Sequence, residues 1–422
     1  MRQYRIQGTN KPLAGELEVG GAKNAVLPIL AAMCLNESIT VIQNCPRIAD
    51  TFVSIDILRC MGYDVEFVEN TLITKPSNTF DCNIPDDCVG KMRSSILFMG
   101  AMLSRCGKIS LALPGGCNLG NRAIDLHISG LKAMGAIIQA DGNKLHCTAK
   151  KLKGARIHLH TPSVGATENL MIAASRASGT TIIENAAKEP EVVDLSLFLS
   201  GMGAKIKGAG TSTIFIDGVE SLAQRMPHRI MPDRIVAGTY LVAAAITGGR
   251  LTLNNVNPVD ILPTITRLID MGCEISTRGE KVSLIAPPRL KPLEKLTTAV
   301  HPGFPTDMQA QFVSALATAD GDSVVKETIF ENRYQHATDL NKMGANITMQ
   351  NDNRTFNIKG VKTLKGKKVK AQDLRGGAAL ILAALNAKGE TTVQNAEYVE
   401  RGYESIDRDL RSLGADIVLE EK

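Results

Sequence analysis

The sequence predicts an α/β fold built from six repeats of about 70 residues, and two observations carry this prediction. The first is a motif, Leu-x-x-Met-Gly with Leu for Met in the last copy, that occurs six times at separations of 73, 68, 69, 72 and 70 residues. Each copy ends an amphipathic helical pattern and precedes an alternating strand pattern, so its glycine should be the left-handed residue that terminates a helix. These glycines are Gly62, Gly135, Gly203, Gly272, Gly344 and Gly414.

The second observation is a pair of further series with the same period. Strand-like segments recur at 38–44, 108–114, 180–186, 250–256, 323–329 and 390–396. Ala-rich apolar segments such as AVLPILAAM, NLMIAASRA and AALILAAL recur between them and predict helices that are buried on most faces. Each repeat therefore consists of a buried helix, a strand, an amphipathic helix and two strands.

The repeats also predict how the chain divides into domains. Six repeats in 422 residues indicate two domains of three repeats each. The sixth repeat ends without its last strand, whereas the first 21 residues contain two spare strand patterns. We therefore expect an N-terminal domain of residues 22–229 and a C-terminal domain of residues 1–21 with 230–422, and we expect the active site in the cleft between them.

Composition excludes several classes of function. A net charge of +5 and only 4% aromatic residues, with no Trp, disfavour a nucleic-acid-binding surface. The N-terminus lacks an apolar signal-peptide segment, and no run of about 18 apolar residues predicts a membrane helix. Nine cysteines without a CxxC pair, and no HExxH motif, indicate reduced thiols in the cytoplasm and no metal site.

The starts of the buried helices are polar in all six repeats, which indicates an anion-binding cleft. Helix N-termini attract anions, and lysine and arginine side chains add to that attraction. N-capping or surface exposure explains any one of these residues, but their recurrence favours a site for phosphate or carboxylate groups. The residues are Lys23, Asn24, Arg93, Ser94, Ser95, Ser163, Val164, Gly165, Ala166, Thr167, Asp233, Arg234, Thr306, Asp307, Asp373, Leu374 and Arg375.

Two further residues are candidates for acid–base chemistry. Cys117 lies in a glycine-rich loop, LPGGCNLGNR, five residues before Arg122. A nearby cation lowers the pKa of a thiol and makes it reactive, although a single cysteine is more often a packing residue. Asp307 follows a proline at a predicted helix start, where it either caps the helix or accepts a proton from a hydroxyl.

Several motifs together resemble those of the enolpyruvyl transferases, and the match runs along essentially the whole chain. They are GGAKNAVLPIL (20–30), LPGGCNLGNRAIDLH (113–127), PSVGATEN (162–169), IIENAAKEPEVVDL (182–195), FPTDMQAQF (304–312), ENRYQH (331–336) and ERGYESID (400–407). The resemblance implies a two-domain inside-out α/β barrel in which each domain has three βαβαββ units. The first segment of the chain then packs with the second domain.

The resemblance also implies a reaction and its residues. The enolpyruvyl group of phosphoenolpyruvate is transferred to the 3-hydroxyl of UDP-N-acetylglucosamine by addition and elimination, as the first committed step of peptidoglycan synthesis. Cys117 corresponds to the acid and Asp307 to the base. Phosphoenolpyruvate is bound by Lys23, Asn24, Arg122, Arg333, Asp373, Arg375 and Arg401. UDP-N-acetylglucosamine is bound by Asn24, Arg93, Arg122, Ala123, Ile124, Asp125, Leu126, Ser163, Val164, Gly165, Asp307 and Ile329. No cofactor, metal, nucleic acid, membrane or obligate protein partner is implied.

Three alternatives are weighed against this interpretation. The 3-phosphoshikimate type is disfavoured because KMRSSILFMGA stands where that type has Gly-Asn-Ala-Gly-Thr-Ala-x-Arg. A DNA-encircling clamp is disfavoured because the repeated helices are apolar. A catalytically idle paralogue that binds nucleotide sugar is disfavoured by Cys117, Asp307 and Lys23. Thr161 and Ala49 stand where many relatives have lysine, which leaves details of the uridine diphosphate contacts open.

Overall fold

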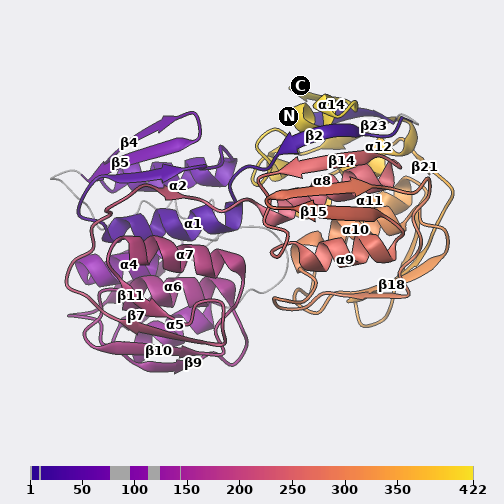
Figure 1. Ribbon diagram of the computed structural model, residues 1–422. Coiled ribbons are helices and arrows are strands. Elements are labelled where there is room, and N and C mark those ends of the chain that lie inside the picture. Colours follow the sequence, from indigo (N-terminus) through magenta and orange to yellow (C-terminus); the bar gives the residue numbers. More distant parts are fainter. Residues whose placement is uncertain (1, 9–10, 77–95, 113–123, 143, 422) are drawn as a thin grey trace. The chain divides into compact units, whose positions relative to one another are not determined.

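The computed structural model describes residues 2–8, 11–76, 96–112, 124–142 and 144–421 (Figure 1). The chain divides into two compact units, one made of the described residues of 1–20 and 232–422 and the other of those of 21–231. We call them the C-terminal unit and the N-terminal unit. No helix within the described ranges is long and apolar enough to cross a membrane.

The N-terminal unit packs three buried helices together, with small sheets and further helices around them. The buried helices contact one another and are α1 (Lys23–Ala32), α4 (Leu97–Cys106) and α6 (Val164–Ala174). The other helices are η1 (Met33–Leu35), α2 (Ala49–Cys60), α5 (Asp125–Ala133) and α7 (Pro190–Gly201). Alanines and other small side chains let these helices approach closely, as at Gly100, where an added Cβ would lie 2.3 Å from the Asn169 amide oxygen.

The sheets of the N-terminal unit, as described, have the strand orders β13-β3-β5-β4, β6-β8-β7 and β11-β12-β10-β9. Their bounds are β3 (Thr40–Gln43), β4 (Tyr63–Val68), β5 (Thr71–Pro76), β6 (Lys108–Ala112), β7 (Ile137–Asp141), β8 (Lys144–Thr148), β9 (Arg156–His158), β10 (Thr180–Glu184), β11 (Lys205–Lys207), β12 (Thr213–Asp217) and β13 (His228–Arg229). In strands such as β12, alternate side chains are buried in the core, here those of Ile214 and Ile216.

The C-terminal unit repeats this arrangement around the buried helices α8 (Arg234–Ile246), α10 (Gln309–Leu316) and α12 (Leu374–Leu385). Its other helices are α9 (Leu262–Asp270), η3 (Thr306–Met308), α11 (Gln335–Lys342), α13 (Ala396–Val399) and α14 (Ile406–Ser412). Within the described chain its sheets have the orders β15-β16-β14-β2, β17-β18-β20-β19 and β21-β23-β1-β24, and β22 also pairs with β23.

The first residues of the chain complete two sheets of the C-terminal unit. Strand β1 (Arg2–Gly8) pairs antiparallel with both β23 and β24, and β2 (Ala14–Glu18) pairs parallel with β14. The remaining strands are β14 (Arg250–Asn254), β15 (Glu274–Arg278), β16 (Lys281–Ile285), β17 (Lys295–Thr297), β18 (Asp322–Lys326), β19 (Asn346–Met349), β20 (Thr355–Lys359), β21 (Leu364–Lys365), β22 (Lys368–Lys370), β23 (Ala387–Gln394) and β24 (Asp416–Glu421).

The local elements predicted from the repeats are confirmed. The six predicted strand segments overlap β3, β6, β10, β14, β18 and β23, although β18 and β23 begin one and three residues before their predicted starts. The six motif glycines all have positive φ, between 90° and 105°. A side chain is strained in this region, so glycine is required at the turn from each helix into the next strand.

A second recurrent turn was not anticipated from the sequence. Four strands are followed by asparagines with φ between 52° and 61°: Asn44, Asn185, Asn255 and Asn395. Their side-chain amides donate, at 2.6–3.0 Å, to the backbone carbonyls of Ile230, Leu159, Val19 and Ala371 respectively. Each carbonyl lies in a segment that leads toward a buried helix, so the asparagine fixes the start of that segment.

The cysteine prediction requires a correction. Among the described cysteines, Cys34, Cys45, Cys60, Cys147 and Cys273 form no disulfide, but Cys106 is disulfide-bonded. The expectation of reduced thiols throughout is therefore wrong for Cys106. Burial raises the pKa of the Cys34 thiol to about 12, which makes that residue an inert part of the core.

Candidate active site

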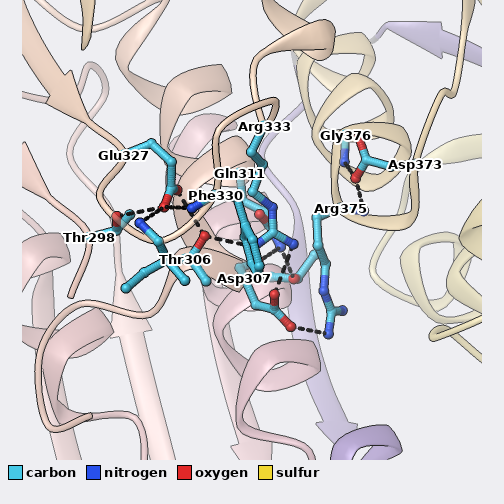
Figure 2. Close-up of polar contacts among 12 residues, drawn as sticks. Thr298, Thr306, Asp307, Gln311, Glu327, Phe330, Arg333, Asp373, Arg375 and Gly376 are labelled. Atoms are coloured by element: carbon cyan, nitrogen blue, oxygen red, sulfur yellow. Dashed lines mark hydrogen bonds and ion pairs between the residues drawn. The ribbon is translucent and has the colours of Figure 1, made fainter. Parts of the chain in front are cut away.

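The C-terminal unit contains a compact group of ionised side chains around Asp307. One carboxylate oxygen of Asp307 lies 2.8 Å from an Arg333 nitrogen, and the other lies 3.0 Å from an Arg375 nitrogen (Figure 2). The two arginine side chains are 4% and 3% exposed, whereas Asp307 is 24% exposed. Asp307 lies inside η3 and does not cap α10, so the N-cap interpretation of this residue is wrong.

Arg375 remains charged although it is buried. Burial opposes its charge, but Asp307, Tyr403 and Asp233 outweigh that effect and raise the pKa of the guanidinium above its usual value. Arg375 also donates to the Tyr403 hydroxyl at 3.3 Å, with its guanidinium 5.6 Å from the centre of the tyrosine ring. These contacts fix the direction in which Arg375 presents its remaining donors.

Asp373 is an N-cap of helix α12. One of its carboxylate oxygens accepts hydrogen bonds from the backbone nitrogens of Arg375 and Gly376, each at 2.9 Å (Figure 2). The cap fixes the backbone of the first turn of α12 and therefore the position from which the Arg375 side chain extends. Ser163 and Asp233 cap α6 and α8 in the same way, whereas α1 and α4 have no side-chain cap.

A buried histidine lies next to this cap. His336 is 3% exposed, and neither of its ring nitrogens has a hydrogen-bond partner among the described residues. Burial lowers the pKa of the ring to about 4; Asp373 opposes this shift and Arg333 adds to it. His336 is therefore a neutral packing residue near pH 7, although it belongs to the ENRYQH motif.

Behind Arg333 lie Thr306, one of the polar helix-start residues named from the sequence, and Glu327, which was not predicted. Arg333 donates to the Thr306 hydroxyl at 2.7 Å, and that hydroxyl donates to Glu327 at 2.8 Å (Figure 2). Glu327 is only 2% exposed. Of the other predicted residues in this unit, Ile329 is 37% exposed and Arg401 is half-buried just after α13.

In the N-terminal unit, Lys23 is the first residue of α1. Its ammonium lies 3.1 Å from a carboxylate oxygen of Asp50, in the first turn of α2. The Lys23 side chain is 14% exposed and that of Asp50 is 5% exposed. Asn24 follows in α1 and is half-buried. The sequence around Asp50 predicts only a helix, and nothing in it indicates that Asp50 pairs with Lys23.

The predicted residues Ile124–Leu126 and Ser163–Gly165 lie at the starts of two helices that contact each other, α5 and α6. Asn169 joins these helices. Its amide oxygen accepts from the Gly100 backbone nitrogen at 2.8 Å, so its amide nitrogen faces the His127 Nδ1 at 2.9 Å. His127 Nδ1 therefore accepts, and its ring lies against Gly165, where an added Cβ would be 3.4 Å away.

Six of the residues predicted from the sequence lie outside the described residues: Arg93, Ser94, Ser95, Cys117, Arg122 and Ala123. Their roles stay predictions. Among the described residues, no group of three or more His, Cys, Asp or Glu side chains could hold a metal ion.

A comparison with protein families identifies the class of protein. Residues 8–410 match the sequence model of the EPSP synthase (3-phosphoshikimate 1-carboxyvinyltransferase) family. The chain therefore belongs to this family of enolpyruvyl transferases, and the resemblance inferred from its motifs is confirmed at that level.

Individual relatives narrow the type. The chain is 47% identical over 418 residues to UDP-N-acetylglucosamine 1-carboxyvinyltransferase 2 of Caldanaerobacter subterraneus subsp. tengcongensis, with 99% of each chain covered. It is 46% identical over 419 residues to UDP-N-acetylglucosamine 1-carboxyvinyltransferase 2 of Clostridium tetani, with the same coverage. Among solved structures, the enolpyruvyl transferase NikO from Streptomyces tendae has a TM-score of 0.88 at 25% identity and covers 99% of this chain and 98% of its own. The predicted α/β fold is thus confirmed as that of enolpyruvyl transferases.

Proposed function

We propose that this protein transfers the enolpyruvyl group of phosphoenolpyruvate to the 3-hydroxyl of UDP-N-acetylglucosamine and releases phosphate. The observation that carries this function is 45–47% identity, over 99% of the chain, to proteins named UDP-N-acetylglucosamine 1-carboxyvinyltransferase. The match covers 99% of this chain and 99% of each of these relatives, so we assign the activity to the whole chain.

The Asp307 group has the chemistry that the addition step requires. Carbon 3 of phosphoenolpyruvate gains a proton while the sugar hydroxyl attacks carbon 2, which gives a tetrahedral ketal. Asp307, held between two guanidiniums and still partly exposed, is suited to accept the hydroxyl proton. In the elimination step, carbon 3 loses a proton and phosphate leaves. We assign donation of the carbon 3 proton to Cys117.

Cations are the natural partners of the phosphate and carboxylate of phosphoenolpyruvate. We assign this role to Lys23, Arg122 and Arg401, with Arg333 and Arg375 in support. Arg375 points its guanidinium at Asp307, so it can contact a ligand bound at that carboxylate. Asn24 contributes a neutral hydrogen-bond donor. Asp373 contributes by holding the start of α12 in place, because it accepts hydrogen bonds from two backbone nitrogens of that helix.

The nucleotide sugar is assigned to a second set of residues, which shares Asn24 and Arg122 with the first. The helix starts at Ile124–Leu126 and Ser163–Gly165 support this assignment, because α5 and α6 are joined through His127 and Asn169. Backbone nitrogens at two neighbouring helix starts suit a diphosphate. Arg93, Ala123, Asp307 and Ile329 complete the proposed set.

We further propose the finer architecture that the resemblance implies. Each domain, 22–229 and 1–21 with 230–422, is one inside-out barrel of three βαβαββ repeats, and the active site lies in the cleft between them. The enzyme acts in the cytoplasm on small-molecule substrates without a cofactor. The six sheets of the described chain support the repeat count.

The test is an assay of phosphate release from phosphoenolpyruvate with two acceptors in parallel. Release is expected with UDP-N-acetylglucosamine and not with shikimate 3-phosphate. Release only with shikimate 3-phosphate would show that the acceptor is wrong. No release with either, together with calorimetric binding of UDP-N-acetylglucosamine, would instead identify an idle nucleotide-sugar-binding paralogue.

A further inference from the structure

One repeat differs from four others at the end of its first strand. Asn44, Asn185, Asn255 and Asn395 follow β3, β10, β14 and β23, and Glu327 follows β18. The neighbouring backbone shows that these positions are equivalent. The last residue of each strand accepts, at 3.0 Å, from the backbone nitrogen of Ile230, Leu159, Val19, Ala371 or Thr298 respectively, and the asparagines contact the first four of these.

Glutamate in place of asparagine at this position reverses the direction of the side-chain hydrogen bonds. The asparagine amide donates to a backbone carbonyl, whereas an ionised glutamate can only accept. One Glu327 oxygen accepts from the Thr298 hydroxyl at 2.9 Å and from the backbone nitrogens of Ile329 and Phe330 at 2.7 and 3.2 Å. Glu327 is not among the described residues with positive φ. This repeat therefore forms its turn without a left-handed asparagine that donates to a backbone carbonyl.

The second oxygen of Glu327 reaches the Asp307 group through Thr306. A guanidinium has no acceptor, so Arg333 must donate to the Thr306 oxygen, at 2.7 Å. The Thr306 hydroxyl proton is consequently directed at Glu327, at 2.8 Å. The other end of the same guanidinium donates to Asp307 at 2.8 Å (Figure 2). Charge alternates along this chain of contacts, from Glu327 to Arg333, Asp307 and Arg375.

We propose that Glu327 is a positioning residue for the reaction assigned above. It holds the Arg333 guanidinium against Asp307 through the Thr306 hydroxyl and fixes the backbone of Ile329 and Phe330. A buried carboxylate at a strand end often serves only the fold, but this fold uses asparagine at four equivalent positions. The departure occurs where the turn adjoins the Asp307 group. The inference rests on the proposed function for the role of Asp307.

The first test compares Glu327→Gln with the parent. The substitution keeps the shape and removes a negative charge behind Arg333. The repulsion between the two carboxylates is then lost, which lowers the pKa of Asp307. We expect kcat to fall roughly 10–100-fold and the acid limb of its pH profile to move down by roughly 0.5–1 pH unit. Asp322→Asn removes an exposed carboxylate from the same segment and should change neither quantity.

The second test uses Thr306, so that a folding defect in one variant does not decide the outcome. Thr306→Val removes the hydroxyl that joins Glu327 to Arg333 and should lower kcat in the same direction, whereas Thr306→Ser keeps the hydroxyl and should remain within about threefold of the parent. The double variant Glu327→Gln with Thr306→Val should be little worse than Glu327→Gln alone, because both changes break one path. Glu327→Asn restores the residue used by the other repeats and should fold but turn over slowly.

A measurement that needs no turnover separates this inference from the proposed function. The Asp307 carboxyl is followed by carbon-13 NMR titration, with Asp307→Asn used for assignment, and its midpoint should be lower in Glu327→Gln. A parent that releases no phosphate with UDP-N-acetylglucosamine overturns the proposed function. An unchanged Asp307 midpoint together with parent-like kcat for Glu327→Gln and Thr306→Val overturns the role of Glu327. A lowered melting temperature with an unmoved midpoint also overturns it, because Glu327 would then serve only the fold.

Discussion

Two buried polar clusters, one in each unit, differ in kind. In the C-terminal unit, Asp307, Arg333, Arg375 and Glu327 are ionisable groups, three of them almost completely buried. In the N-terminal unit, the contact that joins α4, α5 and α6 is made by neutral groups of Gly100, His127 and Asn169. Burying ionised groups is costly unless each is paired, whereas neutral hydrogen bonds join helices at little cost. Helix packing explains the neutral contact, and the charged group requires a further reason, which is chemistry.

The largest expected effect concerns the charged group. Asp307→Asn keeps the shape of the side chain but removes the carboxylate that would accept the hydroxyl proton. We expect kcat for phosphate release to fall roughly 100–1000-fold. Asp320→Asn, which removes an exposed carboxylate of the same unit, is the control. Turnover of Asp307→Asn within a few-fold of the parent would place the base elsewhere.

The second prediction concerns the ion pair of the N-terminal unit. Lys23→Ala removes a partly exposed cation that we assign to phosphoenolpyruvate. We expect kcat/KM for phosphoenolpyruvate to fall roughly 100-fold, about 2.7 kcal/mol, and the Kd for UDP-N-acetylglucosamine to change less than threefold. Lys205→Ala, at an exposed position in β11, serves as the control. Equal losses for both substrates would contradict the assignment of Lys23.

A pH-dependent loss of stability is expected from His336. Its pKa of about 4 in the folded protein lies below the usual 6.5, so the unfolded chain binds the proton first as pH falls. This contribution to the free energy of unfolding is complete above pH 6.5 and is lost toward pH 4. The loss is roughly 2–3 kcal/mol at pH 4.5.

Urea titrations at several pH values test this, with His336→Gln expected to show a shallower pH dependence than the parent. His160→Gln, at an exposed position, should keep the slope of the parent. Identical slopes for the parent and His336→Gln would mean that His336 does not resist protonation.

The neutral contact should affect stability rather than rate. Asn169→Ala leaves the Gly100 backbone nitrogen and His127 without this partner, which should lower the free energy of unfolding by about 1–2 kcal/mol. The measurement is urea unfolding followed by circular dichroism, with Asn351→Ala in an exposed turn as the control. A loss of kcat without a loss of stability would show that the two clusters do not differ in the way described.

The smallest effect is expected at the cap of α6. The Ser163 hydroxyl accepts from the Ala166 backbone nitrogen at a long 3.4 Å. Ser163→Ala should therefore lower the free energy of unfolding by about 0.5–1 kcal/mol. Ser163→Thr keeps the oxygen and should restore most of it. A weakened affinity for UDP-N-acetylglucosamine in Ser163→Ala, measured by calorimetry, would show that the hydroxyl also contacts ligand.

Local pattern was sufficient for much of the fold and for part of the candidate site. The glycines at 62, 135, 203, 272, 344 and 414 terminate helices because only a residue without a side chain adopts their φ readily, and this requirement is visible in the sequence. The apolar helices and the strands between them follow from periodicity in the same way. Asp307, Arg333 and Arg375 were selected by motif, and they do lie together in the structure.

Only the tertiary structure decided which side chains pair with the candidate site residues. Asp50 pairs with Lys23 across 27 positions, and Thr298 meets Glu327 across 29. Such pairs depend on how strands and helices pack, and nothing in the local sequence of either partner specifies the other. The same limit applies to Asp307, whose position after a proline suggested an N-cap and whose carboxylate instead binds two arginines. Sequence determines the repeating elements because backbone geometry is local, whereas the pairing of buried charges is determined by packing because it requires partners brought from distant segments.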